Sequence, residues 1–130
     1  MPKAGLNGFS VLIVDDDSAI RDIYSTTLTG AGYTVYTSND GAEGLATAKE
    51  KHPSVILLDL MMPKMDGREM LKRLKADDGL KTTPVVVFSA LITELEKQDS
   101  IAAGAIDYVE KSDIEEPDQL LAHIEKAIGK

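Results

Sequence analysis

The chain contains no cysteine and no tryptophan, and only two of its 130 residues, His52 and His123, are histidines. Without cysteine, disulfide bonds and thiolate-bound metals are excluded, and two histidines cannot build a histidine-rich metal centre. A metal ion in this protein must therefore be held by oxygen ligands.

Long hydrophobic runs and excess positive charge are also missing. The apolar runs are a few residues long, far short of the roughly 20 that span a bilayer, and no signal-peptide pattern follows Met1. The formal net charge is −8, whereas a nucleic-acid surface needs a basic stripe to neutralise phosphates. We therefore expect a cytoplasmic protein with neither membrane insertion nor a nucleic-acid partner.

A chain of 130 residues is long enough to bury a substantial core without disulfide or metal staples. No linker, internal repeat or low-complexity segment divides it. We therefore expect residues 1–130 to form one domain.

The most informative stretch is VILLDLMMPKMDG, residues 55–67. Four consecutive aliphatic residues precede Asp59, and a loop containing Pro63 follows. An unbroken apolar run bounded by turn residues is typical of a strand buried on both faces, as in a parallel sheet covered by helices. Ligands of such sheets bind beyond the carboxyl ends of the strands. The pattern therefore puts Asp59 at the edge where chemistry takes place, although many strands end in aspartate simply to begin a turn.

Four other segments have strand character, and helical patterns separate them. The predicted strands are residues 9–14, 33–37, 84–88 and 106–109. Strands that alternate with helices through short connections require right-handed crossovers and a three-layer α/β domain. A doubly wound parallel sheet is the economical solution.

Several residues have the character of helix boundaries. Asp17 or Ser18 can cap the first helix, and Asp40 and Asp66 each stand three residues before a glutamate, which is the spacing of a capping box. A more polar helix is predicted from Leu91 to residue 103, and Pro117 is well placed as the first residue of the last helix.

Polar side chains gather where the predicted strands end, namely Asp15, Asp16, Asp59, Ser89 and Lys111. Three carboxylates in one cleft repel each other unless a divalent cation is present, and oxygen ligands without cysteine or histidine suit Mg²⁺. The lysine could hold an anion and the serine could donate a hydrogen bond. This combination suits phosphoryl transfer to a carboxylate.

The motifs VLIVDDD, VILLDLMMPKMDG, VVVFSA and AGAIDYVEK resemble those of response regulator receiver domains, including single-domain chemotaxis-type regulators. They stand in the family's order with family-like separations, and the resemblance covers nearly the whole chain. It implies a flavodoxin-like fold, with a five-stranded parallel sheet in the order 2-1-3-4-5 flanked by five helices. Periodicity alone does not fix that order.

The resemblance also implies the roles of the site residues. Asp59 would be the phosphoacceptor, and the Mg²⁺ ligands would be Asp15, Asp16, Asp59 and the backbone carbonyl of Met61. We interpret Asp17, which follows the implied ligands Asp15 and Asp16, as a helix cap or a solvated side chain.

Ser89 would hydrogen-bond the phosphoryl group and Lys111 would pair with it. Tyr108, together with Ser89, would form the conformational switch, although Tyr108 could equally be an ordinary half-buried strand residue. The implied function is a phosphorylation-activated switch of a two-component or phosphorelay system. Its phosphodonor would be a histidine kinase or phosphotransfer protein, and it would act by binding a downstream protein as a monomer or weak dimer.

The chain departs from the family after the fifth strand. Receiver domains usually place a proline with a cis peptide bond after the lysine, but here Ser112 follows Lys111. A cis bond before a non-proline residue costs about 2.5 to 4 kcal/mol, so we expect a trans bond, or else a strained loop stabilised by its surroundings. The stretch from Lys111 to Leu120 is also about two residues longer than is typical, which affects the start of the last helix.

Two functions of other classes are alternatives. An aspartate-nucleophile phosphatase or mutase acting on a small phosphorylated substrate usually needs a second carboxylate two residues after the nucleophile, where this chain has Met61, which cannot transfer protons. A binding module that does not depend on phosphorylation would be favoured by missing acceptor or metal residues, and none is missing. We therefore expect a protein that is not an enzyme, although it would catalyse its own phosphorylation and dephosphorylation on Asp59. It reads as a stand-alone regulator, but a piece of a longer protein would look identical.

Overall fold

The computed structural model describes residues 8–62, 67–90 and 93–129. Within this part of the chain, strands and helices alternate and a short 3-10 helix follows the last strand. In chain order the elements are β1 (Ser10–Val14), α1 (Ser18–Gly30), β2 (Thr34–Ser38), α2 (Gly41–Lys51), β3 (Val55–Leu58), α3 (Gly67–Ala76), β4 (Val85–Ser89), α4 (Glu94–Ala102), β5 (Asp107–Glu110), η1 (Lys111–Asp113) and α5 (Gln119–Ala127).

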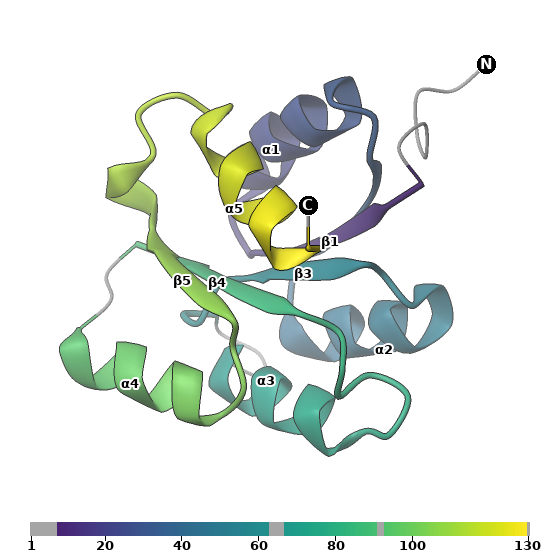
Figure 1. Cartoon of the computed structure of the whole chain (residues 1–130), viewed down its shortest axis with the longest axis vertical. Helices are drawn as coiled ribbons and strands as arrows, with labels where there is room; N and C mark the ends of the chain where they lie inside the picture. The colour runs from purple at the N-terminus through teal and green to yellow at the C-terminus, as the bar shows by residue number, and fades with distance from the viewer. Residues whose placement is uncertain (1–7, 63–66, 91–92, 130) are drawn as a thin grey trace.

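The five strands form one parallel sheet in the order β2-β1-β3-β4-β5. Helices α1 and α5 cover one face of the sheet, and α2, α3 and α4 lie on the other (Figure 1). This arrangement confirms the predicted doubly wound α/β fold, its strand order and its five helices. The four strands outside β3 each begin one residue later than predicted.

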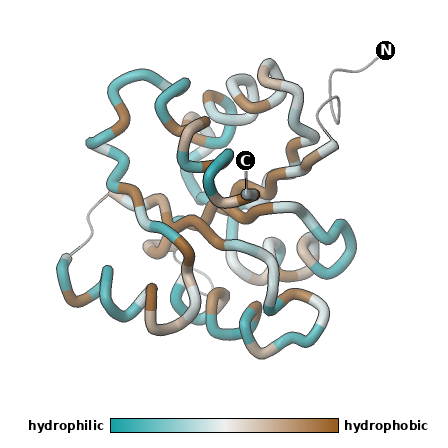
Figure 2. The backbone as a smooth tube through the Cα atoms, in the orientation of Figure 1, coloured by the Kyte–Doolittle hydropathy of each residue, from teal (hydrophilic) through white to brown (hydrophobic). Residues whose placement is uncertain are grey.

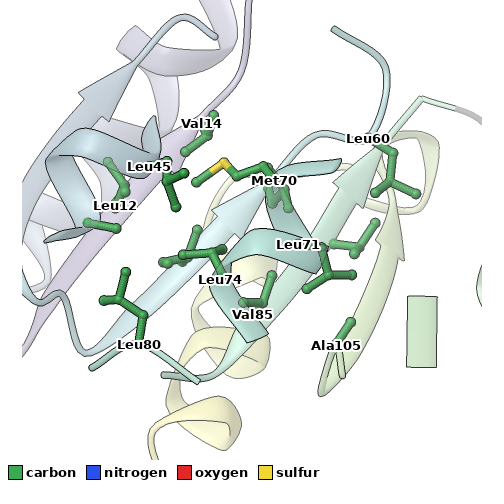
Figure 3. Packing of buried hydrophobic residues seen from close by; sticks show 14 of the residues in the cluster. Leu12, Val14, Leu45, Leu60, Met70, Leu71, Leu74, Leu80, Val85 and Ala105 are labelled. Carbon is green, nitrogen blue, oxygen red and sulfur yellow. The ribbon is translucent and has the colours of Figure 1, made fainter. Parts of the chain in front are cut away.

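The core consists of two apolar layers, one on each face of the sheet. In β3, Val55 and Leu57 belong to the layer under α1 and α5, whereas Ile56 and Leu58 belong to the layer under α2 and α3. Figure 3 shows side chains of the second layer packed between the sheet and these helices, and Figure 2 shows hydrophobic residues concentrated along the central strands. Burial on both faces explains why β3 is an unbroken aliphatic run.

Side chains at the helix ends bear out two of the predicted caps. The carboxylate of Asp17 accepts hydrogen bonds from the N–H groups of Ala19 and Ile20, and Asp40 accepts one from Glu43 N–H at 2.8 Å. These caps satisfy donors that have no partner within the helix. The third predicted cap, Asp66, lies outside the described residues.

The last two helices differ from expectation. The start predicted at Leu91 lies outside the described residues, and α4 begins at Glu94, where Thr93 closes a capping box with Glu96. Pro117 was wrongly predicted as the first residue of the last helix, because α5 begins at Gln119 and Pro117 lies in the turn before it.

Local hydrogen bonds explain the late start of α5. The Gln119 side-chain oxygen accepts the N–H groups of Glu115 and Glu116, at 2.6 and 2.7 Å. The N–H groups of Gln119, Leu120 and Leu121 then bond to carbonyls three residues earlier, which is a tight turn and not an α-helix.

No cis peptide bond occurs in residues 8–62, 67–90 and 93–129, so the bond between Lys111 and Ser112 is trans, as expected. Over the same ranges, every helix is too short or too polar to cross a membrane.

Replacing a core leucine should destabilise the protein far more than replacing a surface leucine. The Leu57 side chain is 1% exposed and the Leu95 side chain is 67% exposed. Leu57→Ala should lower the free energy of unfolding by about 2–5 kcal/mol, since it leaves a cavity between the sheet, α1 and α5. Leu95→Ala should change it by less than about 0.5 kcal/mol. Urea denaturation measures both, and similar losses in the two variants would contradict the assigned burial.

Candidate functional site

The parallel sheet brings the ends of four strands to one edge. Asp15 follows β1, Asp59 follows β3, Ser89 is the last residue of β4, and Lys111 follows β5 directly. The backbone hydrogen bonds between β1 and β3 continue to this edge, because the Asp59 N–H donates to the carbonyl of Val14 at 3.0 Å. The predicted grouping of these side chains is therefore present, and backbone pairing fixes it.

The Asp59 side chain is buried, and both of its carboxylate oxygens have polar partners. Only 5% of the residue is exposed. Its Oδ1 accepts hydrogen bonds from Ser89 Oγ at 3.2 Å and from the Met61 N–H at 3.0 Å, and its Oδ2 lies 3.4 Å from Lys111 Nζ. Three donors from three segments thus hold this carboxylate in one orientation.

Asp15 is the second buried carboxylate, at 2% exposure. Its Oδ2 lies 2.8 Å from Lys111 Nζ, and its Oδ1 accepts the Asp17 N–H at 2.9 Å. Its backbone carbonyl accepts a hydrogen bond from Arg21 at 2.7 Å. Burial raises the pKa of Asp15 overall, although the hydrogen bonds from Lys111 and Asp17 act in the opposite direction.

Lys111 bridges the two buried carboxylates. Burial alone would lower the pKa of its ammonium group, but the hydrogen bonds and charges of Asp15 and Asp59 outweigh that effect and raise the pKa. The ammonium group therefore stays charged at neutral pH and offsets part of the negative charge of the carboxylates.

The group of carboxylates also suits a divalent cation. One oxygen each from Asp15, Asp16 and Asp59 lies within 4.8 Å of the others, and Asp16 is exposed, so the group opens to solvent. With one ammonium group against three carboxylates, a net negative charge is left over. Hard oxygen donors with unbalanced negative charge fit Mg²⁺, so the residues present match the predicted metal.

Gly67 contributes to the site in a way that was not predicted. A Cβ atom on this first residue of α3 would lie 2.3 Å from the Asp59 carbonyl oxygen and 2.5 Å from the Leu60 Cα. Its N–H donates to the Leu60 carbonyl at 3.0 Å. The helix therefore packs directly on the backbone that carries the Asp59 side chain, and the only sequence signal is the glycine at the end of the VILLDLMMPKMDG motif.

Two further residues were predicted to take part in the site, Met61 and Tyr108. Met61 is 57% exposed beside Asp59, and Tyr108 is half-buried on β5 against the apolar layer of α2 and α3. The histidines lie elsewhere. His52 ends α2, and His123 pairs with Asp107, its Nδ1 lying 2.8 Å from the carboxylate.

The sequence model of the response regulator receiver domain family matches residues 11–125 of this chain. The chain is a response regulator receiver domain. Receiver domains are signalling proteins of two-component systems, are not generally classed as enzymes, and bind Mg²⁺ at an aspartate cluster of the kind seen here.

Curated relatives of this receiver domain are longer proteins. The DNA-binding dual master transcriptional regulator RpaA of Synechocystis is 42% identical over 107 residues, which are 82% of this chain and 44% of the relative. The probable transcriptional regulator ycf27 of Porphyridium aerugineum is 36% identical over 101 residues, 78% of this chain and 41% of the relative. The chain thus spans less than half the length of these relatives.

Solved structures match the receiver domain along almost their full length. The chemotaxis protein CheY4 of Vibrio cholerae superposes with a TM-score of 0.85 at 35% identity, over 92% of this chain and 98% of the other. A putative response regulator from Chloroflexus aurantiacus has the same TM-score at 30% identity, over 94% of this chain and 98% of the other. Both likenesses agree with the family and the fold.

Adding one methyl group at Gly67 should disturb the receiver far more than adding it at Gly30. Gly67→Ala forces the new Cβ against backbone atoms, so we expect a loss of about 1–3 kcal/mol in the free energy of unfolding. Gly30→Ala is the matched control, because nothing lies within 4 Å of its Cβ position at the end of α1. Urea denaturation tests both. A Gly67→Ala protein as stable as wild type would rule out this close approach.

Proposed function

We propose that this receiver domain accepts a phosphoryl group on Asp59 and thereby switches its binding to a downstream protein. The observation that carries the proposal is the set of donors around one buried carboxylate. Ser89 Oγ, Met61 N–H and Lys111 Nζ all point at Asp59, while Asp15 and Asp16 lie beside it. The donor would be a phosphohistidine of a histidine kinase or phosphotransfer protein.

In the proposed reaction, a carboxylate oxygen of Asp59 attacks the phosphorus, a P–O bond forms and the P–N bond to the donor imidazole breaks. The imidazole leaves with a proton taken from solvent or from its own protein. Lys111, held beside Asp59, would then pair with a phosphoryl oxygen, and Ser89 would donate a hydrogen bond to another. Mg²⁺, held by Asp15, Asp16, Asp59 and the Met61 carbonyl, would supply charge stabilisation to the transferring group.

The switch would begin at Ser89, whose hydroxyl now donates to Asp59 Oδ1. On phosphorylation it would turn to the phosphoryl group, and Tyr108 on β5 would turn into the space released. Such a change shifts an equilibrium between two existing conformations. The α4 and β5 surface would then present a different shape to the downstream partner.

The phosphatase or mutase alternative is not favoured. The residue two positions after Asp59 is the exposed Met61, which has no group that could act as an acid or base toward a substrate. Phosphorylation and dephosphorylation of Asp59 would instead be reactions of the receiver on itself.

The oligomeric state, the location and the domain organisation of this protein are predictions from its sequence. These predictions are that residues 1–130 form a stand-alone single-domain regulator, that it is a monomer or weak dimer in the cytoplasm, and that it binds no nucleic acid. The description DNA-binding applies to the longer relative RpaA.

Incubation with Mg²⁺ and a small acyl phosphate donor should add one phosphoryl group to the wild-type protein. The Asp59→Asn variant should gain none, because the amide is not a nucleophile toward phosphorus. Intact-protein mass spectrometry measures both. Phosphate on Asp59→Asn in the same amount as on wild type would contradict the assignment of the acceptor.

The same experiment tests the metal. Without a divalent cation the wild type should gain no phosphate, and Asp16→Asn should need a much higher Mg²⁺ concentration. Asp17→Asn is the matched control, since asparagine caps a helix as well as aspartate does. Equal Mg²⁺ requirements in the Asp16 and Asp17 variants would move the metal away from Asp16.

A further inference from the structure

Helix α4 is the least firmly anchored helix of the fold. Of its nine residues, all of which the structure describes, only Ser100 is buried. Its large apolar side chains face solvent, with Leu95 67% and Ile101 45% exposed. Figure 2 shows most of the helix as hydrophilic. By contrast, α5 is also nine residues long but buries Leu120 and Ile124. Apolar packing therefore contributes little to the position of α4.

Polar contacts of the first turn hold α4 instead. Glu96 forms an ion pair with Arg68 of α3, in which the Glu96 side chain is 20% exposed and the Arg68 side chain 52%. Glu96 also completes the capping box, because it accepts a hydrogen bond from the Thr93 N–H and its own N–H donates to Thr93 Oγ1 at 3.1 Å. The Glu96 carboxylate thus takes part in the N-terminal cap of α4 and also pairs the helix with α3.

The next residue of the same turn, Lys97, contacts the predicted switch residue. Lys97 Nζ lies 4.3 Å from the centroid of the Tyr108 ring on β5, within the range of a cation–π interaction. A displacement of the first turn of α4 would therefore change the surroundings of Tyr108.

A pocket of about 210 Å³, partly open to solvent, lies between α3 and α4, and the ion pair forms part of its lining. Leu71 and Ala103 are among the residues that line it, together with Arg68 and Glu96 themselves. The two helices therefore do not fill the space between them, and a shift of α4 meets little steric resistance there.

The Glu96 carboxylate is ionised at neutral pH. Burial alone would raise its pKa, but the hydrogen bonds from Arg68 and Thr93 outweigh that effect and lower it. The contact with Arg68 is therefore a true ion pair under physiological conditions.

We propose that the Arg68–Glu96 ion pair is a latch that holds α4 in its resting position and so sets how often the unphosphorylated receiver visits the switched conformation. Ser89, whose hydroxyl bonds to Asp59, is only four residues before the Thr93 cap of this helix. Arg68 and Glu96 are positioning residues that act through α4. The inference rests on the proposed function, namely that Asp59 accepts a phosphoryl group.

The test uses Glu96→Gln, because the glutamine oxygen can still complete the capping box while the charge that pairs with Arg68 is lost. Asp99→Asn is the matched control. It removes the same charge from the same helix, and within the described residues Asp99 makes no ion pair. Amide NMR spectra are recorded for each protein, free and with Mg²⁺ and beryllium fluoride as the phosphoryl mimic.

Wild-type resonances of Ser89, Ser100 and Tyr108 define a line from free to mimic-bound positions. In free Glu96→Gln these resonances should lie further along that line, by an amount that corresponds to an increase of about two- to fivefold in the ratio of switched to resting molecules. Free Asp99→Asn should coincide with wild type. A purely structural role of Glu96 would lower the melting temperature without moving resonances along this line.

Arg68→Gln and the double variant provide a second, independent measurement. If the two residues act as one pair, the double variant should shift no further than either single variant. Additive shifts would overturn the latch. The latch would also be overturned if the resonances of both single variants coincided with those of the wild type, in an experiment in which the wild type responds to the mimic. If the wild-type resonances do not respond to the mimic, the result contradicts the proposed function itself, and with it the latch that rests on that function.

Discussion

The contact on which the site depends is the bridge that Lys111 makes between Asp15 and Asp59. Two carboxylates that are 2% and 5% exposed would repel each other strongly in this edge of the core, and the ammonium group lies 2.8 and 3.4 Å from their oxygens. The cation comes from the end of β5, whereas the carboxylates follow β1 and β3. The bridge therefore also ties the ends of three strands together at the edge where the proposed chemistry takes place.

Even with this bridge, the three carboxylates carry more negative charge than Lys111 offsets. The same excess of charge links the proposed metal site to the proposed phosphoryl site. The exposed Asp16 opens the cluster to solvent, where a cation can enter, and Ser89 joins Asp59 to β4. Beyond β4, the chain reaches α4, which has one buried residue and is held by Arg68 and by the contact of Lys97 with Tyr108. The strands thus position the groups of the proposed reaction, and in our proposal the loosely packed α4 responds to them.

The sequence was sufficient to predict the parallel sheet and the grouping of the polar side chains at one edge of it. Burial on both faces leaves an aliphatic run such as residues 55–58, and parallel strands bring the polar residues after such runs to one edge. Other features have no periodic signal, because they depend on tertiary contacts. The approach of Gly67 to the Asp59 backbone is one, and the start of α5 at Gln119, set by its side-chain hydrogen bonds, is another. The pairing of Arg68 with Glu96, 28 residues apart, is a third.

The most direct test of this account measures the stability of Lys111→Met with and without Mg²⁺. Methionine is one atom shorter than lysine and similarly unbranched, but it removes the charge that faces two buried carboxylates. Without Mg²⁺, the variant should lose about 3 kcal/mol of unfolding free energy relative to wild type. Saturating Mg²⁺ should restore most of that loss and stabilise the variant more than the wild type, because it neutralises the same carboxylates. A variant as stable as wild type without Mg²⁺, or one that Mg²⁺ does not stabilise, would contradict the claim that charge balance at Asp15 and Asp59 organises the site.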